Sequence, residues 1–172
     1  MKDHSPQDGK AAREALWKHL SDERVAMLRV KGSDQHPQPM TVFADADGGT
    51  VWFITSADTD LFRAIGPGAE AELTLQADGN GYIASLSGRL DPSQDEKKLD
   101  ELWSFAAAAW FEKGREDPSV RLVRFTPREA SVWASRNNPV IVGLKLMRSA
   151  MTEGDADPGV GTHDVFRLDL AA

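Results

Sequence analysis

The side chains that most suggest a chemical role in this chain are five tryptophans, at positions 17, 52, 103, 110 and 133. An aromatic set of this kind packs a core, lines a pocket for a flat ligand, or forms an interface. Trp103 belongs to an apolar helical stripe and is predicted to be core. Trp110 lies in Trp110-Phe111-Glu112-Lys113-Gly114, at the predicted end of that helix, where its side chain can reach a ligand or a partner.

Other common chemistries have little support in the sequence. Cysteine is absent, which excludes disulfides, thiolate zinc sites and a cysteine nucleophile. The G-x-S-x-G elbow of serine hydrolases is absent as well. The histidines lack the spacing of metal ligands, and they are His4, His19, His36 and His163. We therefore predict no metal site, and no residue stands out as a general acid or base.

Charge and hydropathy narrow the possible partners. The chain has 172 residues with 27 acidic and 20 basic side chains, a formal net charge of −7. A field of that sign repels phosphate backbones, so we predict no nucleic-acid partner. No apolar run approaches the roughly 20 residues that span a bilayer, and the polar N-terminus lacks the apolar core of a secretory signal. We expect no membrane partner and a cytoplasmic location.

The elements that must position these residues are mostly short strands. Apolar runs and turn residues predict strands over residues 25–30, 40–44, 50–55, 70–77, 82–90, 120–125, 130–135 and 163–170. The turn around Asp47-Gly48-Gly49 joins two of them into a hairpin, and Asp78-Gly79-Asn80-Gly81 joins two others. Gly88 inside a strand predicts a bulge or a close backbone approach. Pro127 is expected to separate the strands 120–125 and 130–135.

Helices are predicted between these strands. Apolar residues four apart predict a helix over residues 10–20. Asp58 is predicted to cap a short helix that ends at Ile65, and Asp91 to cap a longer one that ends at Gly114. A further apolar stripe runs over residues 140–151. We expect a flexible tail over residues 1–9, one domain over residues 10–152, and a C-terminal loop and edge strand over residues 153–172.

Strands paired as neighbours, without regular β–α–β alternation, predict an antiparallel sheet and a mostly β, α+β fold. A small barrel with flanking helices is the natural closure, because closing a sheet removes its exposed edges.

The order of several segments resembles a known family. These segments include Gln38-Pro39-Met40, Val51-Trp52-Phe53-Ile54-Thr55, Ser85-Leu86-Ser87-Gly88, Trp110-Phe111-x-x-Gly114 and Val132-Trp133. Over roughly residues 10–150 the chain looks like the general stress protein branch of the pyridoxamine 5′-phosphate oxidase-like, flavin-binding split-barrel family. The strand "WFIT" and the block "AWFEKG…DP" are the most specific parts of this resemblance.

The resemblance implies a Greek-key split barrel of about six antiparallel strands, a homodimer, and a flavin mononucleotide (FMN) at each subunit interface. It also implies flavin-dependent oxidoreductase activity. The stretch Gln38 to Val42 would run along the flavin ring, and the stretch Ile54 to Ser56 with the following helix would hold the phosphate. The implied cofactor-binding residues are Gln38, Pro39, Met40, Thr41, Val42, Ile54, Thr55, Ser56, Thr59, Arg63, Trp110 and Trp133. At least one of the two tryptophans would come from the partner chain.

Two positions depart from the family's pattern. Members often carry an arginine where this chain has Gln38, and a lysine where it has Leu61. A phosphate dianion is costly to bury without cations, so these changes weaken the case for FMN. Arg63 on the same short helix is a candidate replacement, and an ordinary solvent-facing role for it is equally compatible with the sequence.

Two alternatives therefore stay open. The same fold can bind another flat cofactor that does not need the two missing cations, such as a deazaflavin, a flavin dinucleotide (FAD) or a haem-like ring. It can also be a stress or interaction protein that has kept the dimer and lost the cofactor.

Overall fold

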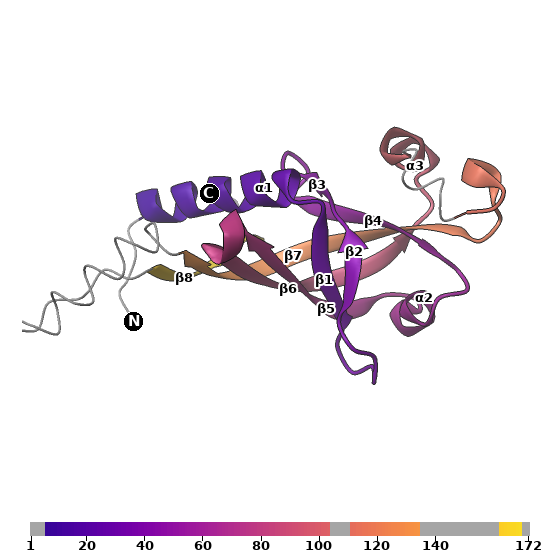
Figure 1. Ribbon diagram of the computed structural model, residues 1–172, viewed down its shortest axis with the longest axis horizontal. Coiled ribbons are helices and arrows are strands. Elements are labelled where there is room, and N and C mark those ends of the chain that lie inside the picture. Colours follow the sequence, from indigo (N-terminus) through magenta and orange to yellow (C-terminus); the bar gives the residue numbers. More distant parts are fainter. Residues whose placement is uncertain (1–5, 104–110, 135–161, 170–172) are drawn as a thin grey trace, which may run out of the picture.

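The computed structural model describes residues 6–103, 111–134 and 162–169. Within them, eight strands form one antiparallel sheet in the order β2-β1-β5-β6-β7-β4-β3, and β8 pairs with β7 (Figure 1). The strands are β1 (Val25–Val30), β2 (Gln38–Thr41), β3 (Phe43–Asp45), β4 (Thr50–Ser56), β5 (Ala69–Ala77), β6 (Tyr82–Ser93), β7 (Val120–Ala134) and β8 (Thr162–Arg167). The helices are α1 (Pro6–Asp22), α2 (Asp60–Ile65) and α3 (Glu96–Leu102), with short 3₁₀ turns over 78–80 and 114–116. The predicted α+β class with an antiparallel sheet is confirmed.

The two ends of the strand order are neighbours in the chain. The predicted strand over residues 40–44 is in fact two strands, because β2 pairs with β1 and β3 pairs with β4. Val42 alone separates them, and its amide donates to the Arg24 carbonyl at 3.0 Å. This change of neighbour joins the two ends of the sheet path through one residue and curls the sheet into a half-barrel.

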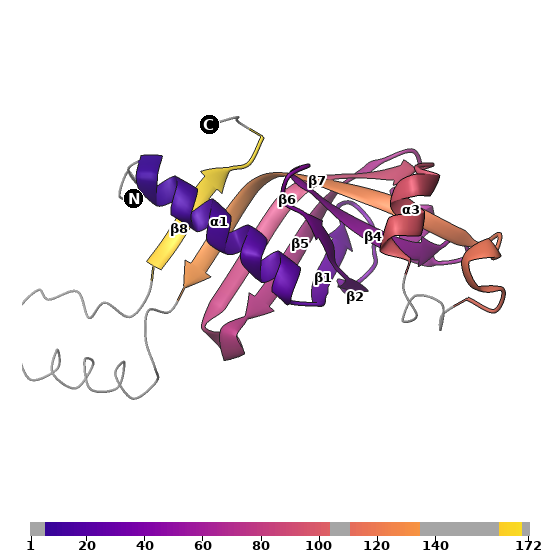
Figure 2. The ribbon, with the colours of Figure 1, turned by 90° about the horizontal axis from the view of Figure 1, so that it is seen from above.

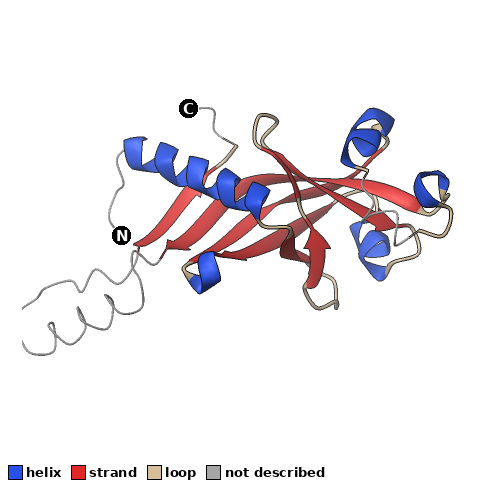
Figure 3. Ribbon diagram, turned by 45° about the horizontal axis from the view of Figure 1, so that its top comes forward, coloured by secondary structure: helices blue, strands red, loops and turns tan. Residues whose placement is uncertain are grey.

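The main core lies on the concave side of the curled sheet. Alternate residues of β1, β5, β6 and β7 point inward, and Leu16 and Leu20 of α1 are fully buried against them. The predicted apolar face of this helix is therefore confirmed, although the helix begins at Pro6, four residues before its expected start. Figure 2 shows α1 lying across the sheet, and Figure 3 shows α2 and α3 at the other end of the strands.

β7 is one strand of 15 residues where the sequence predicted two. Pro127 does not interrupt it, because the register to β6 shifts there and the proline faces Gly88 across a bulge. A Cβ atom on Gly88 would lie 2.3 Å from the Thr126 carbonyl oxygen, so the predicted close approach at Gly88 is confirmed. Arg128 is the extra residue of the bulge, directly after the proline, which cannot donate a ladder hydrogen bond.

Two predicted helix starts are wrong. Thr59, not Asp58, caps α2, and its side chain accepts from the Phe62 amide. Asp95, not Asp91, caps α3, because residues 91–93 continue β6 and pair with residues 122–124 of β7. Asp91-Pro92 has the local preference of a helix start, but cross-strand pairing overrides it. The sequence shows the local preference and does not show the tertiary contact that opposes it.

A second apolar cluster lies on the outer face of the sheet. Trp52, Leu99, Val120 and Leu122 are buried there, and Trp103 and Phe111 pack against them. Trp103 and Phe111 form a tilted ring pair with centroids 5.8 Å apart, in agreement with the predicted packing role of Trp103. Trp110 and the predicted helix over residues 140–151 lie outside the described residues. None of the helices described is long and apolar enough to cross a membrane.

Candidate ligand site at the β2 edge and the β4–α2 turn

Strand β2 offers an open backbone edge, because among the described strands it pairs with β1 alone. Residues of an antiparallel ladder alternate between pairs that exchange hydrogen bonds and pairs that do not. Since the Val42 amide is bonded to Arg24 on the β1 side, the neighbouring Thr41 N–H points away from β1. Pro39, the other residue that faces this way, has no N–H to give. Thr41 is therefore the one backbone amide of the stretch 38–42 directed to the open edge.

The side chains of β2 alternate in the same manner. Gln38 and Met40 are half-buried, whereas Pro39 and Thr41 are exposed. The side-chain amide of Gln38 donates to the side-chain oxygen of Gln35 at 3.2 Å, so these two polar groups are paired with each other at the start of β2. No cation is present at position 38 to receive an anion.

The turn from β4 into α2 is held by hydrogen bonds among its own residues. The Ala57 amide donates to the Ser119 carbonyl at 2.7 Å, and the Asp58 amide donates to the Ser56 hydroxyl at 3.2 Å. The Thr59 amide donates to the Ser56 carbonyl at 3.2 Å. Three consecutive backbone donors, those of Ala57, Asp58 and Thr59, are thus occupied, so a ligand at these three residues would meet their side chains.

The hydroxyl of Thr59 is saturated. It donates to the Ser56 carbonyl at 2.8 Å and accepts from the Phe62 amide at 3.1 Å, and its oxygen lies 3.3 Å from the Thr55 hydroxyl. Because a hydroxyl has one proton, Thr55 must be the donor in that last pair. Thr55 and Thr59 therefore stabilise the turn, and Ser56 is the hydroxyl of this group whose proton has no role inside it. The predicted ligand contacts of Thr55 and Thr59 stay predictions.

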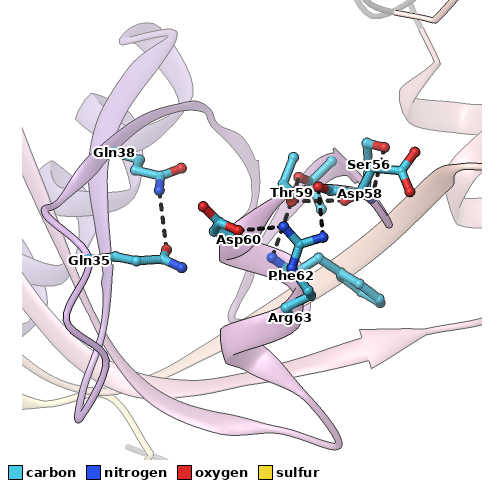
Figure 4. A network of polar contacts seen from close by, with 9 residues as sticks. Gln35, Gln38, Ser56, Asp58, Thr59, Asp60, Phe62 and Arg63 are labelled. Carbon is cyan, nitrogen blue, oxygen red and sulfur yellow. Dashed lines mark hydrogen bonds and ion pairs between the residues drawn. The ribbon is translucent and has the colours of Figure 1, made fainter.

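Arg63 lies on the exposed side of α2 and is already engaged. Its guanidinium donates to the Asp58 carbonyl at 3.0 Å and forms an ion pair with the Asp60 carboxylate. Figure 4 shows the guanidinium reaching back along the helix to these two groups. Both partners of the pair are exposed, Arg63 by 61% and Asp60 by 73%. Leu61, in contrast, is buried in the main core and cannot stand in for a phosphate-binding lysine.

Trp133 lies far from the β4–α2 turn within one chain. It is at the end of β7, whereas Ser56 pairs with Val120 at the start of the same strand. Thirteen residues of extended strand separate the two positions by roughly 40 Å. Ile54 to Ser56 therefore pair with the start of β7, and Trp133 lies near its end. The β2 edge lies on the ladder row that runs from Pro39 through Met27, Thr74 and Ser85 to Ser131, two residues before Trp133.

The outer face of the sheet around Trp133 is apolar, and its large side chains are exposed among the described residues. The five exposed large apolar side chains of the described residues all lie on this face, and they are Val25, Met27, Ile83, Trp133 and Val165, with exposures between 39% and 59%. The residues between them are uncharged apart from the titratable His163, whose ring stacks on Trp133 at 4.7 Å. A row of charged residues containing the Arg29–Glu72 ion pair borders the face. We call this surface the open sheet face.

A pocket of about 280 Å³ lies elsewhere, between β3, the β3–β4 turn and α3. Its charged groups are three carboxylates, Asp45, Asp47 and Glu101, and one cation, Lys98, which lies 3.4 Å from Asp45 and 3.1 Å from Glu101, so the lining carries net negative charge. The Gly48 amide and the Lys98 ammonium lower the pKa of Asp45. The buried Trp52 N–H also helps to lower it, although its geometry falls short of a hydrogen bond. Sequence reasoning missed this pocket, because the contact between Asp45 and Lys98 spans 53 residues.

Comparisons with known proteins agree with this architecture. The sequence profile described as "Pyridoxamine 5′-phosphate oxidase like" matches residues 11–157. No curated protein matches the chain significantly. Within the described part of the chain, no three histidine or carboxylate side chains gather as a metal site would require.

Three crystal structures are similar over most of the chain. A general stress protein 26 from Jannaschia sp. CCS1 is 33% identical, with a TM-score of 0.74, over 91% of this chain and 99% of that chain. A general stress family protein from Xanthomonas campestris pv. campestris is 33% identical, with a TM-score of 0.68, over 80% and 93%. A general stress FMN/FAD binding protein from Xanthomonas citri is 34% identical, with a TM-score of 0.69, over 75% and 92%. The profile, the shared split-barrel architecture and these identities together establish that the chain belongs to the pyridoxamine 5′-phosphate oxidase-like family.

Proposed function

We propose that this protein binds a flavin, with FMN as the first candidate, along the β2 edge and the β4–α2 turn. The observation that carries the proposal is the Thr41 amide, which is directed to an open strand edge as a donor for the polar edge of a flavin ring. The Ser56 hydroxyl at the β4–α2 turn and the Arg63 guanidinium on α2 are the groups that would receive the phosphate. The similarity to a protein named as FMN/FAD binding supports the same ligand class.

The residues present fit a flavin in part. A strand-edge amide, the half-buried Met40 and the hydroxyl of Ser56 suit the ring and the ribityl chain. The phosphate has fewer positively charged partners, because the side chains at positions 38 and 61 are neutral and Arg63 is paired with Asp60. When bound, the flavin would supply electron transfer, and this chain would hold and orient it and shield it from water. A flavin-dependent oxidoreductase is the activity that this arrangement favours.

We further propose that the protein acts as a homodimer through the open sheet face. Contiguous exposed apolar surface on a soluble protein marks an interface. A symmetric dimer presents the same patch from both copies, so the Trp133 of one copy can approach the ligand site of the other. This arrangement resolves the separation of roughly 40 Å along the strand between Trp133 and Ser56 within one chain.

Spectroscopy and titration test the flavin. The purified protein is expected to carry flavin absorbance or to quench the fluorescence of added FMN with a saturable curve. Failure to bind FMN, FAD and riboflavin at saturating concentration would refute the proposal. Light scattering after size exclusion tests the dimer, and a monomer at micromolar concentration would contradict it.

A substitution of Arg63 tests whether this side chain contacts the phosphate of FMN. Arg63→Ala is expected to weaken FMN binding several-fold through loss of a charge-assisted contact, and to leave the affinity for riboflavin unchanged. Arg124→Ala is the matched control, because Arg124 is an exposed arginine of β7 whose register partners are Trp52 and Asp91, away from α2. Equal loss of affinity for both flavins would place Arg63 outside the phosphate contact.

The neutral Gln38 and Leu61 also favour a second candidate, a dimer that binds a different flat cofactor or none. A panel of FMN, FAD, a deazaflavin and haem separates these possibilities. Preference for FMN would remove the second candidate, whereas a dimer that binds no member of the panel would support the cofactor-free form.

A further inference from the structure

We propose that Asp60 sets the ligand specificity of this site by competing with the ligand's phosphate for Arg63. The consequence is a binding site that favours flavins without a terminal phosphate more than a site with a free arginine would. This inference rests on the proposed flavin site and names the residue that selects among flavins there.

The ion pair on α2 provides the geometry. The Arg63 guanidinium is held from two directions, by the Asp58 carbonyl at 3.0 Å and by the Asp60 carboxylate. In the view of Figure 4, Asp60 projects from the side of the helix that faces Gln38, with Arg63 beyond it. An anion that approaches Arg63 from the β2 side therefore meets the Asp60 carboxylate first.

The charges around the turn act in the same direction. The charges of Asp60 and Arg63 cancel within the pair, so the pair offers a phosphate no net positive charge. Positions 38 and 61 add no cation. A phosphate dianion near a carboxylate is repelled even in water, whereas an uncharged ribityl end is not repelled.

The pair is weak enough to exchange. Both side chains are more than half exposed, and exposed ion pairs contribute little net stability. A phosphate can therefore take Arg63 from Asp60, but it must break this pair and accept the nearby carboxylate. Asp60 thus lowers the affinity for FMN without preventing its binding.

A purely structural role for Asp60 predicts a different result. As an acid in the first turn of α2, Asp60 interacts favourably with the helix dipole. If that were its whole role, Asp60→Asn would lower stability slightly and leave the ratio of FMN to riboflavin affinity unchanged.

The test compares two flavins and two charge-neutralising variants of the full-length protein. FMN and riboflavin are titrated into wild type, Asp60→Asn and the control Asp58→Asn, with flavin fluorescence as the readout. Asp58 is a matched control because only its backbone carbonyl contacts Arg63. Asp60→Asn is expected to lower the Kd for FMN by at least about threefold and to leave that for riboflavin unchanged, whereas Asp58→Asn changes either by less than about twofold.

A double substitution identifies the route of the effect. In Asp60→Asn/Arg63→Ala the gain in FMN affinity is expected to disappear, because no guanidinium remains to be released. The gain from Asp60→Asn should also shrink as salt is raised from 50 to about 500 mM, since the Debye length falls severalfold over that range.

The outcomes separate this inference from the proposed function. If wild type binds FMN and Asp60→Asn leaves the FMN to riboflavin ratio unchanged, the inference is overturned and the flavin site stands. If Asp60→Asn changes both affinities equally, the competition for Arg63 is refuted in the same way. If no variant binds either flavin, the proposed function itself fails.

Discussion

The two halves of β7 carry similar apolar side chains but differ in what covers them. In the first half, Val120 and Leu122 point to the outer face and are buried beneath α3 with Leu99. In the second half, Trp133 points to the same side of the sheet and is 44% exposed. The comparison teaches that, among the described residues, one part of the outer surface of the sheet is covered by α3 and another part is exposed, with the bulge at Gly88 and Pro127 between them.

The strongest test of the contrast between the two halves of β7 is to disrupt the bulge that lies between them. A valine at Gly88 would place its Cβ 2.3 Å from the Thr126 carbonyl oxygen and 2.7 Å from the Pro127 Cα, and backbone atoms cannot move aside. Gly88→Val is expected to cost at least about 3 kcal/mol of unfolding free energy, measured by denaturant titration.

Gly49→Ala is the control for that change. Gly49 has a φ of +63° and no heavy atom within 4 Å of a built Cβ, so only backbone strain of about 1 kcal/mol is expected. A Gly88→Val protein with wild-type stability would mean that the close approach of Gly88 to Thr126 does not constrain the bulge between the two halves of β7.

The covered half is tested at Leu99, which is 5% exposed under α3. Leu99→Ala removes buried methyl groups and leaves a cavity, so the free energy of unfolding should fall by about 2–4 kcal/mol. Val165→Ala in the open half is the matched comparison, because Val165 is 59% exposed and should lose less than about 0.5 kcal/mol when the monomer is measured. Equal losses at both sites would erase the contrast between the halves.

The open half is tested by a charge at its centre. Val165→Asp should leave the folded monomer intact and weaken self-association at least about tenfold, because the dimer would bury an unpaired carboxylate. Sedimentation velocity and light scattering measure the effect, with Ala46→Asp in an exposed turn as the control. If Val165→Asp associates like wild type, the interface lies elsewhere.

The smallest expected effect is seen only in alkali. Burial, with the nearby Asp164, raises the pKa of Tyr82 from 10.0 to about 12. The unfolded chain therefore loses this proton at lower pH than the folded one, and stability falls as the pH rises from 10 to about 12, by about 1–2 kcal/mol. Tyr82→Phe should flatten this decline, because the buried hydroxyl that has no hydrogen-bond partner would be gone. An unchanged alkaline profile would assign the decline to other groups.

Local pattern was enough to predict most of the strands and the close approach at Gly88. The alternation of β1 and the turn after Ala77 are visible in neighbouring residues, and both elements are found where expected. The errors occur where distant pairing decides the outcome. Asp91-Pro92 has the chemistry of a helix start, yet its pairing with Arg124 and Val123 keeps it in β6.

The location of the candidate site stays a prediction, and the state of its groups could not be predicted from the sequence. The family resemblance placed the site at residues 38–42 and 54–63. Only coordinates reveal that the Thr59 hydroxyl is saturated, that Arg63 is paired with Asp60, and that Thr41 carries the outward-facing amide. Each depends on hydrogen-bond partners, which residue type and spacing do not determine.

The single residue between β2 and β3 has a mechanical consequence. Since Val42 alone connects β2 to β3, which stand at the two ends of the sheet path, the chain itself limits how far the barrel can spread at that seam. A molecule seated against Thr41 would rest beside this one-residue connection, where the backbone has little freedom to open.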